Sequence, residues 1–318
     1  MDNIIGVDIG GTKCGVILGR ASGDKIDIIE KRAFLTKDYP HPERALAKCA
    51  GDIESLIKGH KITAVGICCG GPLDNIKGII QSPPNLPGWD DIPICQFFQE
   101  RFSVPAYLQN DANACALAEW RYGAGKGTEN FIFLTFGTGL GAGLIINSRL
   151  YAGKQCMAGE IGHWRMYPFG PVGYGKAGSL EGFCGGGGIA QLAGQKLLEL
   201  RQMGKSHILM EKPQPPEAKD VFRLAVEKDP LCLEIITTIG ETFGKAASML
   251  IDLLNPQVIA GGSIFTRQYD LLYPIVREMV SRESLSLSGE NCRILPSELG
   301  EEIGDIGALA VALADAGA

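Results

Sequence analysis

The chain has 318 residues, 45% hydrophobic content and a formal net charge of -6. This length predicts about two domains, and the hydrophobic content excludes a disordered chain. We find no basic run that would follow a nucleic-acid backbone, no apolar stretch of the roughly 18 residues that a membrane span needs, and no signal or transit peptide. We therefore expect a cytoplasmic protein with no nucleic-acid and no membrane partner.

The 10 cysteines do not form a recognisable framework. They are scattered through apolar surroundings, and none of them belongs to a C-x-x-C pair. We expect buried free thiols, because a disulfide scaffold is typical of short secreted chains.

The first part of the chain predicts alternating strands and helices. Apolar runs and periodicity predict a strand, turn and strand over 4–18, strands over 26–35, 62–69 and 106–108, and helices over 40–58, 93–102 and from the segment 110–114 through 120. Asp8 ends the first strand, directly before Gly10-Gly11-Thr12. A carboxylate there is able to hold a hydrated Mg²⁺ beside phosphates, and an ordinary turn aspartate is the alternative.

Three later segments of this part are candidate ligand positions. The strand over 62–69 ends in Gly70-Gly71-Pro72, where α/β folds place ligands. The Pro-rich loop over 82–89 carries Asn85 and Trp89, which also fit a plain structural connector. Asp111 is predicted at a helix N-terminus, where the helix dipole keeps a carboxylate ionised; this position suits a catalytic base or a plain N-cap.

The segment 131–163 combines two further features. Two apolar runs flank the turn Gly137-Thr138-Gly139-Leu140-Gly141, whose glycines are able to take positive φ and turn N–H groups toward a phosphate. Glu160 and His163 follow, a carboxylate and an imidazole that are able to hold adjacent hydroxyls of a polyol. The two glycine-turn hairpins, over 4–18 and 131–146, indicate a duplicated domain plan.

The second part predicts helices over 189–200, 240–254, 269–282 and 306–314, strands over 258–260 and 293–295, and a Pro-rich loop over 203–219. The strand over 258–260 runs into Gly261-Gly262-Ser263, where bare backbone lets a flat ligand such as adenine approach. The flexible segment 123–127 is the expected boundary. We expect an N-terminal domain over 1–122, a C-terminal domain over 123–304, and a final helix within 305–318 that packs back on the first domain.

The ordered set of these motifs resembles the ROK family of sugar kinases and repressors, and the resemblance covers essentially the whole chain. It implies an α/β, ribonuclease H-like fold of the actin and hexokinase superfamily, with two duplicated domains and a cleft between them. It also implies a homodimer. In this family DIGGTK resembles the first phosphate loop, FGTGLGAG the second and GGS the adenosine loop. These loops contribute the implied ATP contacts, which are Asp8, Gly10, Gly11, Thr12, Lys13, Gly137, Thr138, Gly139, Gly141, Gly261 and Gly262.

The same resemblance implies how sugar and metal are bound. The implied sugar contacts are Gly71, Asn85, Asn110, Asp111, Glu160, His163 and Glu181, with Asp111 as the catalytic base and Mg²⁺ held by Asp8 through water. Zinc-containing members carry C-x-C-G-x-x-G-C-x-E after the histidine, whereas Val172, Tyr174 and Ser179 stand at the cysteine positions here. One histidine alone cannot hold a tetrahedral structural zinc, so we expect none and expect aromatic packing by Trp164, Tyr167 and Tyr174 instead.

The implied activity is ATP-dependent phosphorylation of the 6-hydroxyl of a hexose, with a glucokinase-type enzyme as the first expectation. N-acetylglucosamine, N-acetylmannosamine, fructose and allose remain alternative substrates, because selectivity depends on the detailed shape of the pocket. Polyphosphate is an alternative donor. A sugar-sensing ROK regulator is the alternative from another class; the chain begins in the first phosphate strand, which leaves no room for a helix-turn-helix domain, and it retains both phosphate loops.

Overall fold

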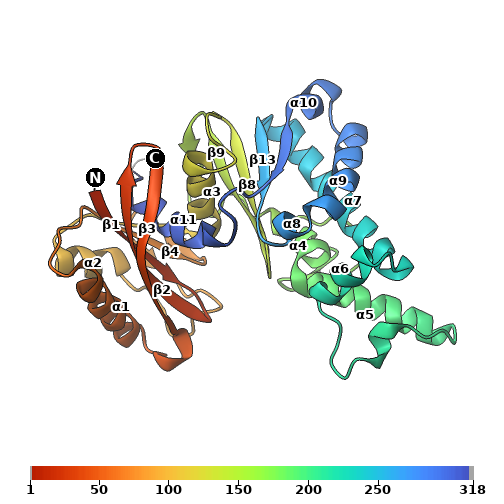
Figure 1. Cartoon of the computed structure of the whole chain (residues 1–318), viewed down its shortest axis with the longest axis horizontal. Coiled ribbons are helices and arrows are strands. Elements are labelled where there is room, and N and C mark those ends of the chain that lie inside the picture. Colours follow the sequence, from red (N-terminus) through yellow and green to blue (C-terminus); the bar gives the residue numbers. More distant parts are fainter. Residues whose placement is uncertain (1, 315–318) are drawn as a thin grey trace. The chain divides into compact units, whose positions relative to one another are not determined.

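A computed structural model describes residues 2–314 and divides the chain into two compact units (Figure 1). The first unit comprises the chain up to Phe133, the segment Gly143–Gly159 and the chain from Glu298 onward; the second comprises Leu134–Ala142 and Glu160–Ser297. The expected boundary at 123–127 lies inside the first unit. The chain leaves one unit for the other after residues 133, 142, 159 and 297.

The first unit is built on a five-stranded sheet with the order β3-β2-β1-β4-β7. Its strands are β1 (Asp2–Ile9), β2 (Lys13–Ser22), β3 (Lys25–Leu35), β4 (Val65–Cys69) and β7 (Ala106–Asn110). The first three are antiparallel neighbours, whereas β1, β4 and β7 run parallel. The parallel strands therefore end at one common edge of the sheet.

Helices cover both faces of this sheet, as Figure 1 shows. Side chains of one face, such as Val7, Val16 and Ile67, form a core with α1 (Pro42–Ile57) and α2 (Ile94–Phe102). On the opposite face α11 (Ile303–Ala312) contacts β1 and β4 and packs against α3 (Asp111–Tyr122). The chain from Glu298 onward thus belongs to the first unit, on which the final helix was expected to pack. Residues 315–318 of the expected segment lie outside the described residues.

The approach of α11 depends on glycine in the sheet. A Cβ atom at Gly66 of β4 would collide with the backbone of Ala308 and Ala312 in α11. A Cβ atom at Gly6 of β1 would lie 2.9 Å from the Cβ of Ala308. Because no side chain stands between them, the helix backbone rests directly on the sheet.

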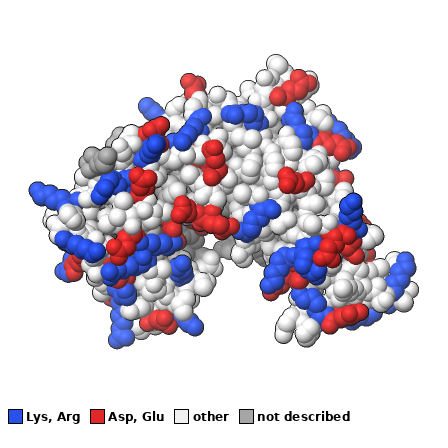
Figure 2. Space-filling view, viewed as in Figure 1, with Lys and Arg blue, Asp and Glu red and all other residues white. Residues whose placement is uncertain are grey.

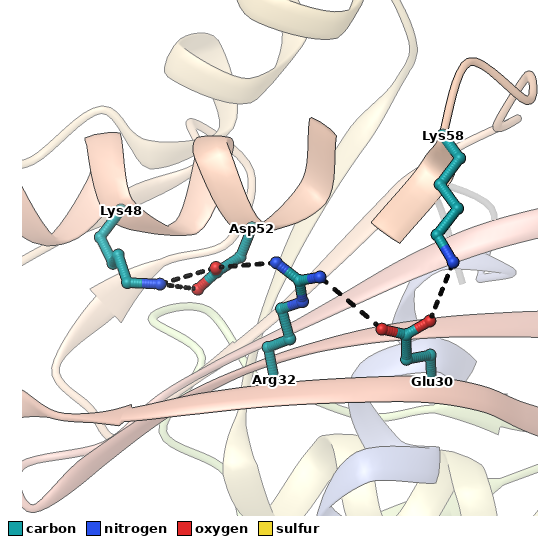
Figure 3. Close-up of polar contacts among 5 residues, drawn as sticks. All are labelled: Glu30, Arg32, Lys48, Asp52 and Lys58. Atoms are coloured by element: carbon teal, nitrogen blue, oxygen red, sulfur yellow. Dashed lines mark hydrogen bonds and ion pairs between the residues drawn. The ribbon is translucent and has the colours of Figure 1, made fainter. Parts of the chain in front are cut away.

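A chain of charged side chains joins β3 to α1 (Figure 3). Lys48 lies 2.5 Å from buried Asp52, and Arg32 lies 3.7 Å from both Asp52 and Glu30. Lys58 pairs with Glu30 at 3.8 Å. Glu30 and Arg32 therefore both reach residues of α1 or its C-cap, which fixes the side of β3 that faces this helix.

The second five-stranded sheet has the order β10-β9-β8-β13-β14. Its strands are β8 (Phe131–Phe136), β9 (Leu140–Ile146), β10 (Arg149–Leu150), β13 (Val258–Gly261) and β14 (Arg293–Pro296). The helices of the second unit are α4 (Leu180–Cys184), α5 (Gly186–Gln202), α6 (Ala218–Val226), α7 (Pro230–Leu254), α8 (Ile264–Arg267), α9 (Tyr269–Glu283) and α10 (Ser286–Asn291). Two small hairpins complete the chain: β5 (Leu73–Asp74) with β6 (Ile79–Ile80), and β11 (Val172–Gly173) with β12 (Lys176–Ala177).

The predicted long strands and helices are confirmed, with three corrections. Helix α7 begins at Pro230, ten residues before its predicted start, because Asp229 caps it and Pro230 is tolerated in its first turn. Helix α5 begins at Gly186, within a glycine run that was not predicted to be helical. The Pro-rich segment 203–219 contains a 3-10 turn, Ile208–Glu211, and the start of α6.

A partly buried polar cluster holds this Pro-rich segment. His207 Nε2 lies 3.1 Å from the carboxylate of Asp229, while His207 Nδ1 accepts a hydrogen bond from the N–H of Leu209. Cys232 lies close enough to these two side chains for a shared metal ion. Both ring nitrogens of His207 already have hydrogen-bond partners. We therefore interpret the cluster as a helix-capping network that joins the loop to α7.

The ten cysteines are all free, and nine of them are buried, as predicted from their apolar surroundings. Within residues 2–314, no helix combines the length and the apolar character needed to cross a bilayer.

The close packing at Gly66 gives a stability test. We expect Gly66→Ala to lower the free energy of unfolding by about 2–4 kcal/mol, because the added methyl collides with backbone that cannot rotate away. Gly51→Ala is the matched control: Gly51 lies inside α1 with open space around it, and this change should stabilise the protein by about 0.5–1 kcal/mol. Urea unfolding measures both, and equal effects would show that α11 is not seated on β4.

Candidate functional site

The register of the parallel strands aligns three candidate residues at one edge of the first unit. Ile9 lies opposite Cys69, and Cys69 lies opposite Asn110. The next residues along the three strands are Gly10, Gly70 and Asp111. The carboxyl edge of this sheet, where α/β folds bind ligands, therefore carries segments that the sequence places far apart.

Asp8 lies one residue before this edge, and its carboxylate is partly buried. Burial raises the pKa of Asp8 to about 6, and the negative charges of Asp305 and Asp111 act in the same direction. Lys31 and Lys13 oppose this shift. Among residues 2–314 no donor is hydrogen-bonded to the Asp8 carboxylate, so its oxygens are open to a hard cation such as hydrated Mg²⁺, which fits the predicted role.

Asp111 is the first residue of α3, and Asn110 is its N-cap. The N–H of Ala112 donates to Oδ1 of Asn110 at 2.9 Å and to Oδ1 of Asp111 at 2.8 Å. The capping role considered for Asp111 is thus carried by Asn110. The Asp111 side chain is exposed, while the protein atoms around its carboxyl displace water and raise its pKa.

The first glycine turn, between β1 and β2, leaves two N–H groups open. Gly10 N–H donates to the carbonyl of Lys13, whereas the N–H groups of Gly11 and Thr12 have no acceptor in the described part of the chain. A Cβ atom at Gly11 would lie 2.5 Å from the carbonyl oxygen of Asn85. Glycine is therefore needed here because the Asn85 loop lies directly on the turn, which brings two predicted site segments together.

The second turn, between β8 and β9, repeats this arrangement in the second unit. Gly137 N–H donates to the carbonyl of Gly139, and Gly141 N–H donates to the hydroxyl of Thr135. The N–H groups of Thr138 and Gly139 have no acceptor within residues 2–314. Neither turn contains a glycine with positive φ, so the predicted conformational reason was wrong.

Close packing explains the glycine at position 139. Its Cβ would lie 2.9 Å from Glu181 Oε2, and the same oxygen accepts a hydrogen bond of 3.1 Å from the N–H of Leu140. Glu181 is thereby fixed against the second turn. A predicted sugar contact and a predicted phosphate loop are thus in direct contact in the second unit.

Glu160 is the N-cap of a single 3-10 turn, Ile161–His163, and His163 is its last residue. Tyr174 packs edge-on against the His163 ring with 5.1 Å between ring centroids, and the ammonium of Lys176 donates to the His163 carbonyl at 2.6 Å. Tyr174 stands at one of the positions where zinc-containing ROK proteins carry cysteine. An aromatic contact and a lysine thus hold the turn in this chain.

The second unit also contains a cavity of about 480 Å³, within the usual range for small-molecule sites. It opens beside the second turn, with Gly137 and Thr138 in its wall. Gly261 and Gly262 are buried and directly precede Ser263, which lines the cavity. The sequence did not identify the remaining lining residues, which are Gly186, Gly187, Ala190, Glu217, Ala218, Lys219, Phe222, Ile264, Arg267 and Gln268.

The structure therefore assembles the predicted residues in two groups. The first unit brings together Asp8, Gly10, Gly11, Thr12, Lys13, Gly71, Asn85, Asn110 and Asp111. The second unit contains Gly137, Thr138, Gly139, Gly141, Glu160, His163, Glu181, Gly261 and Gly262. The cavity was missed because its wall comes from helices α5, α6 and α8, whose side chains carry no motif and meet only in the folded chain.

Comparison with known proteins identifies the family of this chain. The model of the ROK family matches residues 4–315. The glucokinase of Halalkalibacterium halodurans is 30% identical over 310 residues, which cover 95% of this chain and 92% of that protein. The xylose repressor of Caldicellulosiruptor bescii is 27% identical over 319 residues, which cover 98% of this chain and 78% of that protein.

A solved structure extends the likeness to three dimensions. The ROK family glucokinase from Streptomyces griseus, in complex with glucose and AMPPNP, superposes with a TM-score of 0.76 at 28% identity, covering 98% of this chain and 99% of that chain. The chain belongs to the ROK family and has the two-domain α/β fold of the actin and hexokinase superfamily.

Proposed function

We propose that this chain is an ATP-dependent hexose kinase that phosphorylates the 6-hydroxyl of its sugar, with glucose as the first candidate. The names of its relatives support the class, since one is a glucokinase and another was solved with glucose and an ATP analogue. The observation that carries the proposal is the position of Asp111, an exposed residue at the sheet edge that begins α3 directly after its N-cap Asn110.

Asp111 has the properties of a general base in this reaction. It would accept the proton of the sugar 6-hydroxyl while the sugar oxygen bonds to the γ-phosphorus and the bond from phosphorus to ADP breaks. A raised pKa means that the carboxylate holds this proton more tightly. The hydrogen bond from Ala112 N–H fixes the carboxylate, so little reorganisation is needed when the proton moves.

The two glycine turns would bind the phosphates. Each turn offers two consecutive N–H groups without a protein acceptor, at Gly11 and Thr12 and at Thr138 and Gly139. Such N–H pairs stabilise negative charge without adding a titratable group. Mg²⁺, held by Asp8 through water, would neutralise charge on the phosphates, and Lys13 lies next to the first turn to contribute a positive charge.

The proposed sugar contacts are Gly71, Asn85, Asn110 and Asp111 in the first unit and Glu160, His163 and Glu181 in the second. The proposal includes no structural zinc, since Val172, Tyr174 and Ser179 replace the cysteine ligands. In this proposal His163 is oriented by its ring contact with Tyr174 and by the hydrogen bond from Lys176 to its carbonyl.

The adenosine part of ATP would occupy the cavity of about 480 Å³ in the second unit. Phe222 offers an aromatic face, and Glu217, Lys219 and Gln268 offer polar groups for the base and ribose. The cavity adjoins Gly137 and Thr138, so a nucleotide bound there would extend its phosphates toward the second turn.

The second candidate is a sugar-sensing regulator, which the xylose repressor relatives favour. A regulator needs the sugar contacts alone, whereas this chain also keeps Asp111 and two turns with open N–H groups. Basic and acidic side chains are interspersed over the face drawn in Figure 2, which contrasts with the one-sign surface typical of nucleic-acid binding. A homodimer stays a prediction from the family resemblance, and a cytoplasmic location stays a prediction from the sequence.

A coupled assay that detects ADP tests the function and ranks the substrates. We expect turnover with ATP and Mg²⁺ on glucose, to be compared with N-acetylglucosamine, N-acetylmannosamine, fructose and allose. Polyphosphate is tested as the donor in a separate assay that detects the sugar phosphate, because this reaction releases no ADP. Sugar binding without phosphorylation by any donor would contradict the kinase and favour the regulator.

The base is tested by Asp111→Asn, which keeps an oxygen to accept from Ala112 N–H but removes the basic carboxylate. We expect kcat to fall by about 10²–10⁴-fold, the scale of a positioned base, while calorimetry shows that sugar binding is retained. Asp27→Asn, an exposed carboxylate on β3, is the control and should leave kcat unchanged. Near-normal turnover of the Asp111 variant would remove it from the role of base.

The nucleotide cavity is tested by Ala190→Leu on α5, which places a larger side chain in its wall. We expect KM for ATP to rise by about tenfold or more, a loss of roughly 1.4 kcal/mol of binding, with KM for the sugar unchanged. Gly194→Leu lies one turn further along the same helix, in open space, and serves as the control. A rise in the sugar KM alone would place the nucleotide elsewhere.

A further inference from the structure

An ion pair that no motif identifies lies beside Asp8 in the first unit. Both carboxylate oxygens of Asp305 lie 2.5 Å from the ammonium of Lys31. Their side chains are 14% and 35% exposed, so the pair is only partly screened by water. Asp305 is in the first turn of α11, and Lys31 is on β3, 274 positions apart in the chain.

The strand geometry explains why Lys31 reaches this place. Its neighbours Glu30 and Arg32 are engaged with residues of α1 and its C-cap (Figure 3). Since successive side chains of a strand point to opposite faces, Lys31 extends over the face that carries α11. A Cβ atom at Gly15 would lie 3.8 Å from both Lys31 Cε and Asp8 Cβ, so the two side chains lie over the same stretch of backbone.

Both members of the pair act on Asp8 electrostatically. Lys31 and Asp8 lie over the same backbone at Gly15, and Asp305 binds the Lys31 ammonium, so one positive and one negative charge lie near the Asp8 carboxylate. The effects of these two opposite charges at the cation position cancel in part. If one residue lost its charge, the charge of the other would act on the cation without compensation. The Lys31 ammonium in particular is a positive charge that would repel Mg²⁺ if Asp305 did not hold and neutralise it.

We propose that Asp305 and Lys31 are a pair of positioning residues that balances the charge at Asp8. This balance sets how tightly the site binds the divalent cation compared with metal-free nucleotide phosphates. The inference rests on the proposed function, because it takes Asp8 as the residue that holds the cation. Asp305 acts through Lys31 and through its own field at Asp8. Neither residue carries out a chemical step.

Opposite single changes should have opposite effects. Asp305→Asn leaves the Lys31 ammonium unneutralised, so the divalent cation should bind about threefold to tenfold more weakly and metal-free ADP more tightly. Lys31→Met leaves the Asp305 carboxylate unneutralised, so the cation should bind more tightly by a similar factor and metal-free ADP more weakly. The double variant restores neutrality and should return both affinities toward those of the wild type.

The experiment measures Mn²⁺ binding in the presence of ADP by electron paramagnetic resonance and metal-free ADP binding by calorimetry, on the full chain without turnover. Both single variants lose the same ion pair and should show similar decreases in Tm. A purely structural role would therefore shift both affinities in the same direction in both variants, which would overturn the inference. Lys31→Arg, which keeps the charge, should behave as the wild type and gives a second measurement if Asp305→Asn fails to fold.

The wild type separates this outcome from failure of the proposed function. If it binds no Mn²⁺ with ADP, the kinase proposal fails, and the inference fails with it. If it binds them but the single variants do not diverge, the kinase proposal stands and only the charge-balancing role of Asp305 and Lys31 is rejected.

Discussion

The parallel register of β1, β4 and β7 is the constraint on which the candidate site of the first unit depends. Hydrogen bonding in this register brings Ile9, Cys69 and Asn110 into line, so the residues that follow them leave the sheet at one edge. Asp111 then enters α3 at its first position, where Asn110 caps the helix. A shift of one residue in either strand pair would move these groups along the edge and turn their side chains to the other face.

Concentrating carboxylates at this edge has an electrostatic cost. Burial is the main cause of the raised pKa of Asp8, and the negative charges of Asp305 and Asp111 add to it. The cost is offset locally by Lys31 and by the backbone N–H of Ala112, and globally by the packing of α11 on the glycines of β1 and β4. The same helix therefore stabilises the sheet and carries one of its charges, which links the stability of the first unit to the chemistry of its edge.

The two glycine turns are alike in a way that backbone angles do not explain. In both, one internal hydrogen bond closes the turn, at Gly10 and at Gly137, and the next two N–H groups stay open. In both, glycine makes room for another predicted site segment, Asn85 in the first unit and Glu181 in the second. The duplicated domain plan thus extends from the hairpins to the way each phosphate turn contacts a candidate sugar residue.

Local patterns were enough to predict most long strands and helices, the two turns and the candidates Asp8 and Asp111, because these depend on period, glycine placement and residues near in sequence. Local patterns did not predict the start of α7 or the helical glycines of α5, because tertiary context and capping determine where these helices begin. They did not predict the cavity beside Thr138 either, because helices that are distant in the sequence form its wall. The ion pair of Lys31 and Asp305 is the clearest case. Its residues are 274 positions apart, and only the strand alternation of β3 and the packing of α11 on the sheet bring their charges together.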